Sequence, residues 1–385
     1  MACFKPLLAI PYPSSHAKYG QYHVLGSALD PLTVNRIPNW PGVDKSTGVD
    51  LRTGQYLGTI RIPCGNCLGC RLDKSRDWAT RIVCESMDYP ESANWFVTLT
   101  YADYHIDRDG RAYYPHATQN EDGALILDKS HPQLWLKSIR EGYDRRFGAR
   151  LYDTPVYYDE SLDKEIPLGT RYYLAGEYGD QGQRPHYHCI LMNTPLPDIY
   201  PYGKTRLGMP LFRSPYLEEK WGRGFVTIGQ LNYRTAAYTA RYTMKKADGK
   251  TDAQYEALGL TPEYTVMSRR PGIGYNYLVK DDAAKGRALY VGDDDHAPTD
   301  SIILPAIDER SSNINKPPRY FDVKYSEIDP VAVAKAKSRR AEVAEKINAI
   351  KLEDTDLDEA AYMEVLEKSV TQSVKALARK FTDLS

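Results

Sequence analysis

The sequence predicts an α+β protein with a central antiparallel sheet of about five strands and helices packed against it. Two observations predict this class. Segments rich in β-branched and aromatic residues alternate with segments of helical periodicity, in the order strand, helix, strand, strand, strand, helix. In addition, the strands 171–178 and 186–192 are joined by a loop that contains glycine and aspartate, which favours an antiparallel pair.

The elements follow in chain order. The helices expected in the core region are 71–87, 130–146 and 233–246, and the strands are 94–101, 171–178, 186–192 and 225–228. Two amphipathic helices follow, with apolar stripes at Val333, Ala336, Val343, Ile347 and Ile350, and at Tyr362, Leu366, Val370, Val374, Leu377 and Phe381. We therefore expect an N-terminal arm with a cysteine cluster and a basic helix (1–92), a core (93–290), a linker (291–328) and a C-terminal helical hairpin (329–385).

Composition limits the function classes. The chain has 385 residues, of which 42% are hydrophobic and 26% charged, and its net charge of −1 does not indicate nucleic-acid binding by the whole surface. Any DNA contact must come from a local basic patch. No apolar run reaches the roughly 18–20 residues of a membrane span. Because the first residues also lack a signal-peptide pattern, we expect a cytoplasmic protein with no membrane partner.

The most informative motif is the histidine pair, His186 and His188, at the start of an apolar run. Residues two apart in a strand point to the same face, so both imidazoles face the same way. Glu177 lies across the hairpin, where a carboxylate completes a three-ligand set. Such a set leaves open positions for water or a phosphate oxygen, as a catalytic Mg²⁺ or Mn²⁺ requires. The alternative is that all three are ordinary polar residues of the strands.

A second candidate site lies on the tyrosine helix, 233–246. Tyr238 and Tyr242 are four residues apart, and Lys245 or Lys246 follows on the same face. A phenol is a poor nucleophile at neutral pH, so attack by either tyrosine needs a cation or a metal nearby. A lysine supplies that cation or stabilises charge on a phosphate during transfer. The alternative is a tyrosine pair that packs in the core.

Three cysteines form a third group. Cys64, Cys67 and Cys70 precede the basic helix, and thiolates at this spacing bind Zn²⁺ if a fourth ligand is supplied, for which Cys3 is the candidate. A bacterial ferredoxin cluster would need a further cysteine where the chain has Lys74. Free reduced thiols are the other alternative.

Basic residues supply candidate DNA contacts. Segment 268–274 combines Arg269 and Arg270 with proline and glycine, and guanidinium groups on such a backbone suit phosphate binding. A surface turn with solvated arginines is the alternative. The other candidates for DNA contacts are Arg241 in the tyrosine helix and Arg71 and Lys74 in the basic helix.

Three of these features occur in the order of the motifs of HUH endonucleases. They are the strand 96–101, the histidine pair and the tyrosine helix. The two-tyrosine form, together with the segments 64–71 and 267–274, resembles the replication initiators of microviruses of gokushovirus type, which are small single-stranded DNA phages. The resemblance extends over about residues 64–277.

The resemblance implies an HUH endonuclease-like core and a rolling-circle replication initiator. Tyr238 or Tyr242 would nick single-stranded viral origin DNA through a 5′-phosphotyrosine, and the other tyrosine would later help to rejoin the displaced strand as a circle. A metal bound by the histidine pair and Glu177 would polarise the scissile phosphate. The implied partners are a host helicase and polymerase, and the implied location is the cytoplasm of the infected bacterium.

Two other functions fit the same residues. In a non-catalytic, zinc-stabilised DNA-binding protein, the histidine pair and the tyrosines would be structural. An HUH relaxase or transposase would keep the chemistry but use it for mobilisation or transposition. The paired tyrosines and the cysteine cluster favour phage replication.

Overall fold

The computed structural model divides into two compact units. One unit comprises residues 1–73 and 344–380, and the other comprises 74–343 and 381–385. The structure describes residues 3–13, 22–44, 49–54, 57–103, 105–106, 108–113, 116–147, 156–159, 164–167, 169–179, 183–206, 208–245, 252–279, 287–292, 297–305 and 313–381.

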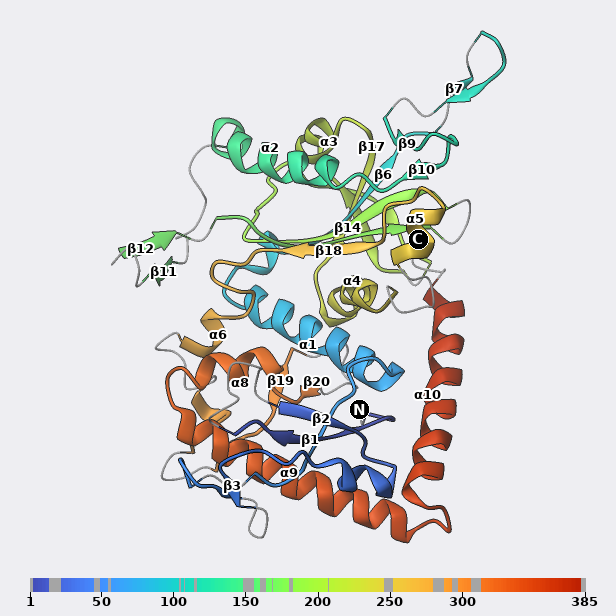
Figure 1. Ribbon diagram of the computed structural model, residues 1–385. Helices are drawn as coiled ribbons and strands as arrows, with labels where there is room; N and C mark the ends of the chain where they lie inside the picture. Colours follow the sequence, from blue (N-terminus) through green and yellow to red (C-terminus); the bar gives the residue numbers. More distant parts are fainter. Residues whose placement is uncertain are drawn as a thin grey trace. The chain divides into compact units, whose positions relative to one another are not determined.

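The larger unit is built on a seven-stranded antiparallel sheet in the order β15-β16-β17-β6-β14-β13-β18 (Figure 1). The strands are β6 (Trp95–Tyr101), β13 (Arg171–Tyr178), β14 (Pro185–Met192), β15 (Tyr200–Lys204), β16 (Pro210–Arg213), β17 (Gly224–Gln230) and β18 (Tyr264–Met267). The α+β class and the antiparallel sheet are confirmed. The prediction of about five strands was too low, because β15, β16 and β18 lack the alternation of a half-buried strand.

Helices cover both faces of this sheet. They are α1 (Leu68–Ser86), α2 (Ser130–Phe147), α3 (Pro215–Trp221), α4 (Tyr233–Lys245), α5 (Asp252–Ala257), α6 (Asn276–Val279), α8 (Arg319–Tyr325), α9 (Pro330–Glu353) and α10 (Glu359–Phe381). Figure 1 shows α2 and α3 on one face of the sheet, with α4 and α1 on the other. The tyrosine helix of the sequence analysis is α4, and the basic helix is α1.

Alternation along the central strands separates two cores. The core toward α2 and α3 contains Val97, Leu99, Cys189, Leu191, Trp135, Ile139, Tyr216 and Leu217. The core on the opposite face contains Tyr173, Ile190, Met192, Ala79, Ile82 and Ala236. Because successive side chains of a strand point to opposite faces, the histidine pair shares the second face with Ile190.

Short two-stranded sheets decorate the chain. They are β3 (Val43–Asp44) with β4 (Val49–Asp50), β7 (His105–Ile106) with β8 (Ala112–Tyr113), β9 (Thr118–Gln119) with β10 (Leu125–Ile126), β11 (Val156–Asp159) with β12 (Lys164–Pro167), and β19 (Ile302–Leu304) with β20 (Asn313–Asn315). The stretch 291–328, expected to be a linker, contains β19, β20 and α8. It buries Ile302, Leu304 and Phe321 in the core beside α1. Those apolar residues were too sparse in a polar stretch to indicate a packed segment.

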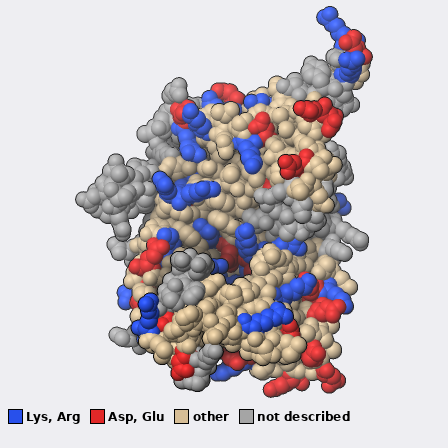
Figure 2. All heavy atoms as spheres, in the orientation of Figure 1, with Lys and Arg blue, Asp and Glu red and all other residues tan. Residues whose placement is uncertain are grey.

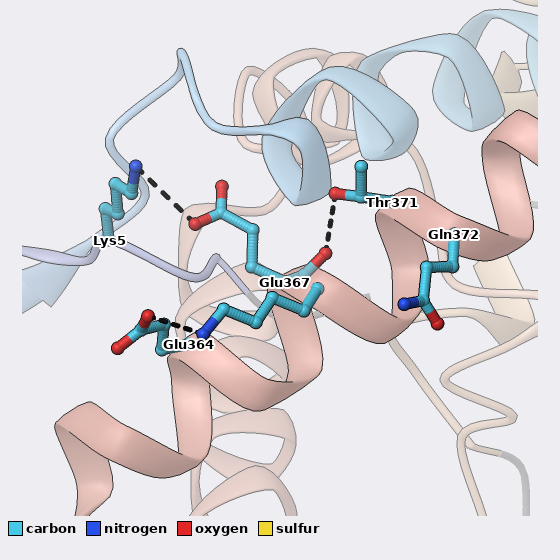
Figure 3. A pocket seen from close by; sticks show the side chains of 6 residues that line it. Lys5, Glu364, Glu367, Thr371 and Gln372 are labelled. Atoms are coloured by element: carbon cyan, nitrogen blue, oxygen red, sulfur yellow. Dashed lines mark hydrogen bonds and ion pairs between the residues drawn. The ribbon is translucent and has the colours of Figure 1, made fainter.

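The smaller unit contains a three-stranded sheet of β2 (Tyr22–Ser27), β1 (Leu7–Pro11) and β5 (Ile60–Ile62), with a small core of Ile10, Leu25 and Leu57. Ion pairs connect the N-terminal segment to α10. Arg61 pairs with Glu359, and the Lys5 ammonium lies 3.5 Å from Glu367. Figure 3 shows Lys5 reaching toward α10 over a pocket that Glu364, Glu367 and Gln372 line.

The expected C-terminal hairpin is wrong in part. Both helices form, but Val343, Ile347 and Ile350 of α9 are 56%, 45% and 58% exposed, so only the first part of the predicted stripe, at Val333 and Ala336, is buried. The second half of α9 therefore does not pack against α10 through its apolar stripe. No helix in the described ranges is long and apolar enough to cross a membrane.

Candidate functional site

Strand pairing brings the histidine pair and Glu177 together. Glu177 of β13 is directly opposite His186 of β14, and Thr98 of β6 is directly opposite His188. Directly opposite residues in an antiparallel pair have side chains on the same face. All four side chains therefore lie on the face that α4 covers, as the hairpin prediction requires for Glu177.

One carboxylate oxygen of Glu177 contacts both imidazoles. Its Oε1 is 2.6 Å from Nε2 of His186 and 2.9 Å from Nε2 of His188. Glu177 and His188 are buried, at 3% and 5% exposure, while His186 is half-buried and opens the group toward solvent. One donor atom from each residue lies within 4.8 Å of the others, so the three can bind one cation.

The buried carboxylate of Glu177 is stabilised in its ionised form. Burial acts to raise its pKa, but hydrogen bonds from His186 and His188 outweigh this effect and lower the pKa well below its usual value. The oxygen is therefore an anionic donor at neutral pH. Anionic oxygen together with imidazole nitrogen is a suitable ligand set for Mn²⁺, and it also accommodates Mg²⁺.

The second nitrogen of each imidazole has its own partner. Nδ1 of His186 lies 3.2 Å from the carbonyl oxygen of Arg184, and Nδ1 of His188 lies 3.0 Å from Oγ1 of Thr98. When Nδ1 donates its hydrogen to these oxygens, Nε2 is left unprotonated and can bind a metal. The sequence analysis missed Thr98, although its position on the predicted strand 94–101 was a usable signal.

The α4 tyrosine nearest the described ligands is Tyr238. Its hydroxyl oxygen lies 3.5 Å from Nε2 of His188, the same nitrogen that contacts Glu177. Phe96 stacks on the imidazole of His188 at 5.5 Å between ring centroids and meets Tyr238 edge-on. Phe96 therefore packs against the two groups whose relative position matters for any reaction at this site.

The remaining α4 candidates are placed only in part. Tyr242 and Lys245 belong to α4, but their side chains lie outside the described part of the structure, as does Lys246 altogether. Tyr238 and Tyr242 are nevertheless one helical turn apart. The prediction that both tyrosines serve one site stays a prediction.

The segment 268–274 is held by a buried charge network. Glu85 accepts hydrogen bonds from Nε of Arg171 at 2.6 Å and from the backbone N–H of Gly274 at 2.7 Å. The Arg171 guanidinium also donates to the carbonyl of Pro271 at 2.8 Å, and Arg81 donates to that of Ile273 at 2.9 Å. The network fixes the backbone of this segment.

Close packing explains the glycines of the segment. A Cβ on Gly272 would approach the hydroxyl of Tyr320, and Gly274 has a φ of +79°, which favours glycine. Arg269 and Arg270, in contrast, are exposed. A fixed backbone thus presents two guanidinium groups to solvent, an arrangement that suits phosphate contact.

The other candidate DNA contacts are dispersed. Lys74 is exposed, while Arg71 and Arg241 are half-buried. Figure 2 shows Lys and Arg interspersed with Asp and Glu on the face in view, in agreement with the net charge of −1. Binding of DNA would therefore depend on local groups such as Arg269 and Arg270.

Comparison with known proteins identifies the family. A family model for replication-associated proteins of the ORF2 type matches residues 94–247, which contain the strand, the histidine pair and α4. The chain is 33% identical to the replication-associated protein ORF2 of Spiroplasma virus 4 over 267 residues, covering 69% of this chain and 68% of the relative. The chain belongs to the family of phage replication-associated proteins.

Two further relatives have the same description. The replication-associated protein VP4 of Bdellovibrio phage phiMH2K is 28% identical over 53% of this chain and 55% of its own length. The replication-associated protein ORF4 of Chlamydia phage 1 is 27% identical over 56% of this chain and 45% of its own length. The resemblance to microvirus replication proteins is thereby confirmed. No solved structure matches this replication-associated protein.

Proposed function

We propose that this replication-associated protein initiates rolling-circle replication by nicking and rejoining single-stranded origin DNA. The observation that carries the proposal is the placement of the Tyr238 hydroxyl 3.5 Å from Nε2 of His188, beside the Glu177 carboxylate. A phenol, two imidazoles and an ionised carboxylate on one face supply a nucleophile and a cation site together.

The reaction is a balanced exchange of phosphodiester bonds. The tyrosine oxygen bonds to phosphorus, the bond from phosphorus to the 3′ oxygen breaks, and the tyrosine proton is lost while the 3′ oxygen gains one. The 5′ side stays on the protein as a phosphotyrosine, and the free 3′-hydroxyl is available to a polymerase. Because a phosphodiester replaces a phosphodiester, the reverse attack by a 3′-hydroxyl rejoins the strand without an energy source.

The residues present fit the divalent metal that this chemistry uses. Glu177, His186 and His188 would hold Mg²⁺ or Mn²⁺, and the bound ion would polarise the scissile phosphate. Thr98 and the Arg184 carbonyl orient the imidazoles, while Phe96 keeps His188 and Tyr238 in register. Lys245 and Lys246 follow Tyr242 in the sequence and are proposed to stabilise charge on the phosphate.

Covalent capture tests the proposal. The full chain is incubated with Mn²⁺ and single-stranded oligonucleotides of randomised central sequence, and adducts that survive denaturation are isolated and sequenced. We expect the label of 3′-end-labelled DNA to stay with the protein and that of 5′-end-labelled DNA to be released with an extendable 3′-hydroxyl. DNA binding without an adduct under any divalent metal would instead support the non-catalytic alternative.

Thr98→Val is expected to weaken Mn²⁺ binding by about 10- to 100-fold, because an imidazole that loses its outer-shell partner is a less well oriented ligand. Isothermal titration of the full chain with Mn²⁺ measures the effect. Thr100→Val is the matched control, since Thr100 lies on the same face of β6 and its hydroxyl donates to the Phe225 carbonyl. Equal effects of the two variants would contradict the role of Thr98.

The double variant Arg269→Ala, Arg270→Ala is expected to weaken single-stranded DNA binding at every sequence. Each lost phosphate contact should reduce the slope of log K against log salt by about 0.7. Fluorescence anisotropy over a series of salt concentrations gives this slope. Arg52→Ala, which removes an exposed arginine of the other unit, serves as the control. An unchanged slope in the double variant would contradict phosphate contact by segment 268–274.

A further inference from the structure

Four of the six cysteines gather at one point of the smaller unit. Cys3 precedes β1, Cys64 and Cys67 lie between β5 and α1, and Cys70 is in the first turn of α1. Cys84 and Cys189 are instead buried at 1% and 0% exposure within the two cores of the larger unit. Folding therefore brings Cys3 to three thiols that are more than sixty positions away in the sequence.

The sulfur atoms are spaced as the corners of a tetrahedron around one ion. Cys3 Sγ lies 3.8 Å from Cys67 Sγ, and Cys64 Sγ lies 3.9 Å from Cys70 Sγ. All four sulfurs are within 4.8 Å of one another. Four sulfurs at about 2.3 Å from a tetrahedral Zn²⁺ would be separated by about 3.8 Å.

Other states of the thiols fit this spacing less well. Disulfide sulfurs approach to about 2.0 Å, much closer than any sulfur pair of this group. A cluster of several irons would separate its cysteines further, because irons and sulfides stand between them. Backbone N–H groups also donate to the sulfurs, from Cys64 to Cys3 at 3.2 Å and from Cys67 to Cys64 at 3.3 Å. Such donors stabilise thiolates in metal sites.

We infer that Cys3, Cys64, Cys67 and Cys70 bind one Zn²⁺ ion. Four protein thiolates fill the tetrahedral coordination of zinc, so no position is open for water or a phosphate. The ion therefore has a structural role, distinct from the cation of the proposed nicking site. It fastens the segment before β1 to the first turn of α1, which Arg71 continues.

Metal analysis of the full chain tests the inference. Protein purified without chelators or metal supplements is expected to contain one zinc per chain by inductively coupled plasma mass spectrometry. A thiol-reactive mercurial should release that zinc to a chromophoric indicator. Refolding with Co²⁺ should give the visible absorption bands of a tetrahedral tetrathiolate site. Bound iron in place of zinc, or protein that is soluble and folded without metal, would overturn the inference.

Variants locate the ion. Cys67→Ser should reduce zinc from one per chain to near zero, whereas the matched variant Cys84→Ala, which removes a buried thiol outside the group, should keep it. If Cys67→Ser does not fold, the mercurial release measured on the unaltered chain still decides the question. Zinc retained at full occupancy in a folded Cys67→Ser variant would contradict this ligand set.

Discussion

The double variant Tyr238→Phe, Tyr242→Phe is expected to form no covalent DNA adduct, a loss on the order of 10⁴-fold or more in nicking rate. Phenylalanine keeps the ring but has no oxygen to bond to phosphorus, so the reaction loses its nucleophile. The edge-on contact of ring 238 with Phe96 needs only the ring and should persist. The measurement is adduct formation per minute with the oligonucleotide selected by covalent capture.

The single variants reveal which tyrosine cuts first. Because the Tyr238 hydroxyl lies beside His188, we expect Tyr238→Phe to lose more of the first cut than Tyr242→Phe. Equal partial losses would indicate interchangeable nucleophiles instead.

Tyr233→Phe is the matched control for both variants. Tyr233 is on the same helix, but its hydroxyl donates to Asn315 at 3.1 Å, away from the histidine pair. This variant should nick at the normal rate. Adduct formation by the double variant would reject both tyrosines as nucleophiles.

The second large effect concerns stability. Glu85→Gln is expected to destabilise the protein by about 3–5 kcal/mol, because it leaves the guanidinium of Arg171 buried without its counter-charge. Glu85 is 1% exposed and Arg171 is 4% exposed, so water cannot replace the lost interaction. Chemical denaturation followed by circular dichroism measures the free energy of unfolding.

A surface ion pair and a double variant complete this experiment. Lys137→Met removes a pair with Glu141 whose side chains are 69% and 57% exposed, and it should change the free energy of unfolding by less than about 1 kcal/mol. Glu85→Leu with Arg171→Met should recover part of the loss, since it removes both buried charges. Equal effects of Glu85→Gln and Lys137→Met would contradict the importance of burial.

The sequence predicted the central strands well, for a physical reason. Residues 171–178 and 95–101 are rich in aromatic and β-branched side chains, and their observed bounds differ from the predicted ones by at most one residue. The same reasoning missed the pairing of β15 with β16. β15 contains proline and glycine and is exposed along its whole length, so nothing in its pattern indicates a strand.

The candidate site was predictable to the extent that it follows from strand pairing. The antiparallel hairpin places Glu177 opposite His186, and a period of two places His188 beside them. The positions of Thr98 and Phe96 depend instead on which strand lies on the other side of β14, which sequence order does not reveal. The buried Glu85 network was also hidden, because its partners are more than eighty positions apart in the chain.

The position of β14 between β6 and β13 affects when the site becomes ordered. Ladder bonds on both sides mean that local opening of this strand needs nearly the free energy of unfolding the whole domain. The conformational entropy of fixing His186 and His188 is therefore lost during folding, before any cation or DNA arrives. Binding energy from the substrate then remains available for what is still free to adjust, which is the DNA backbone itself.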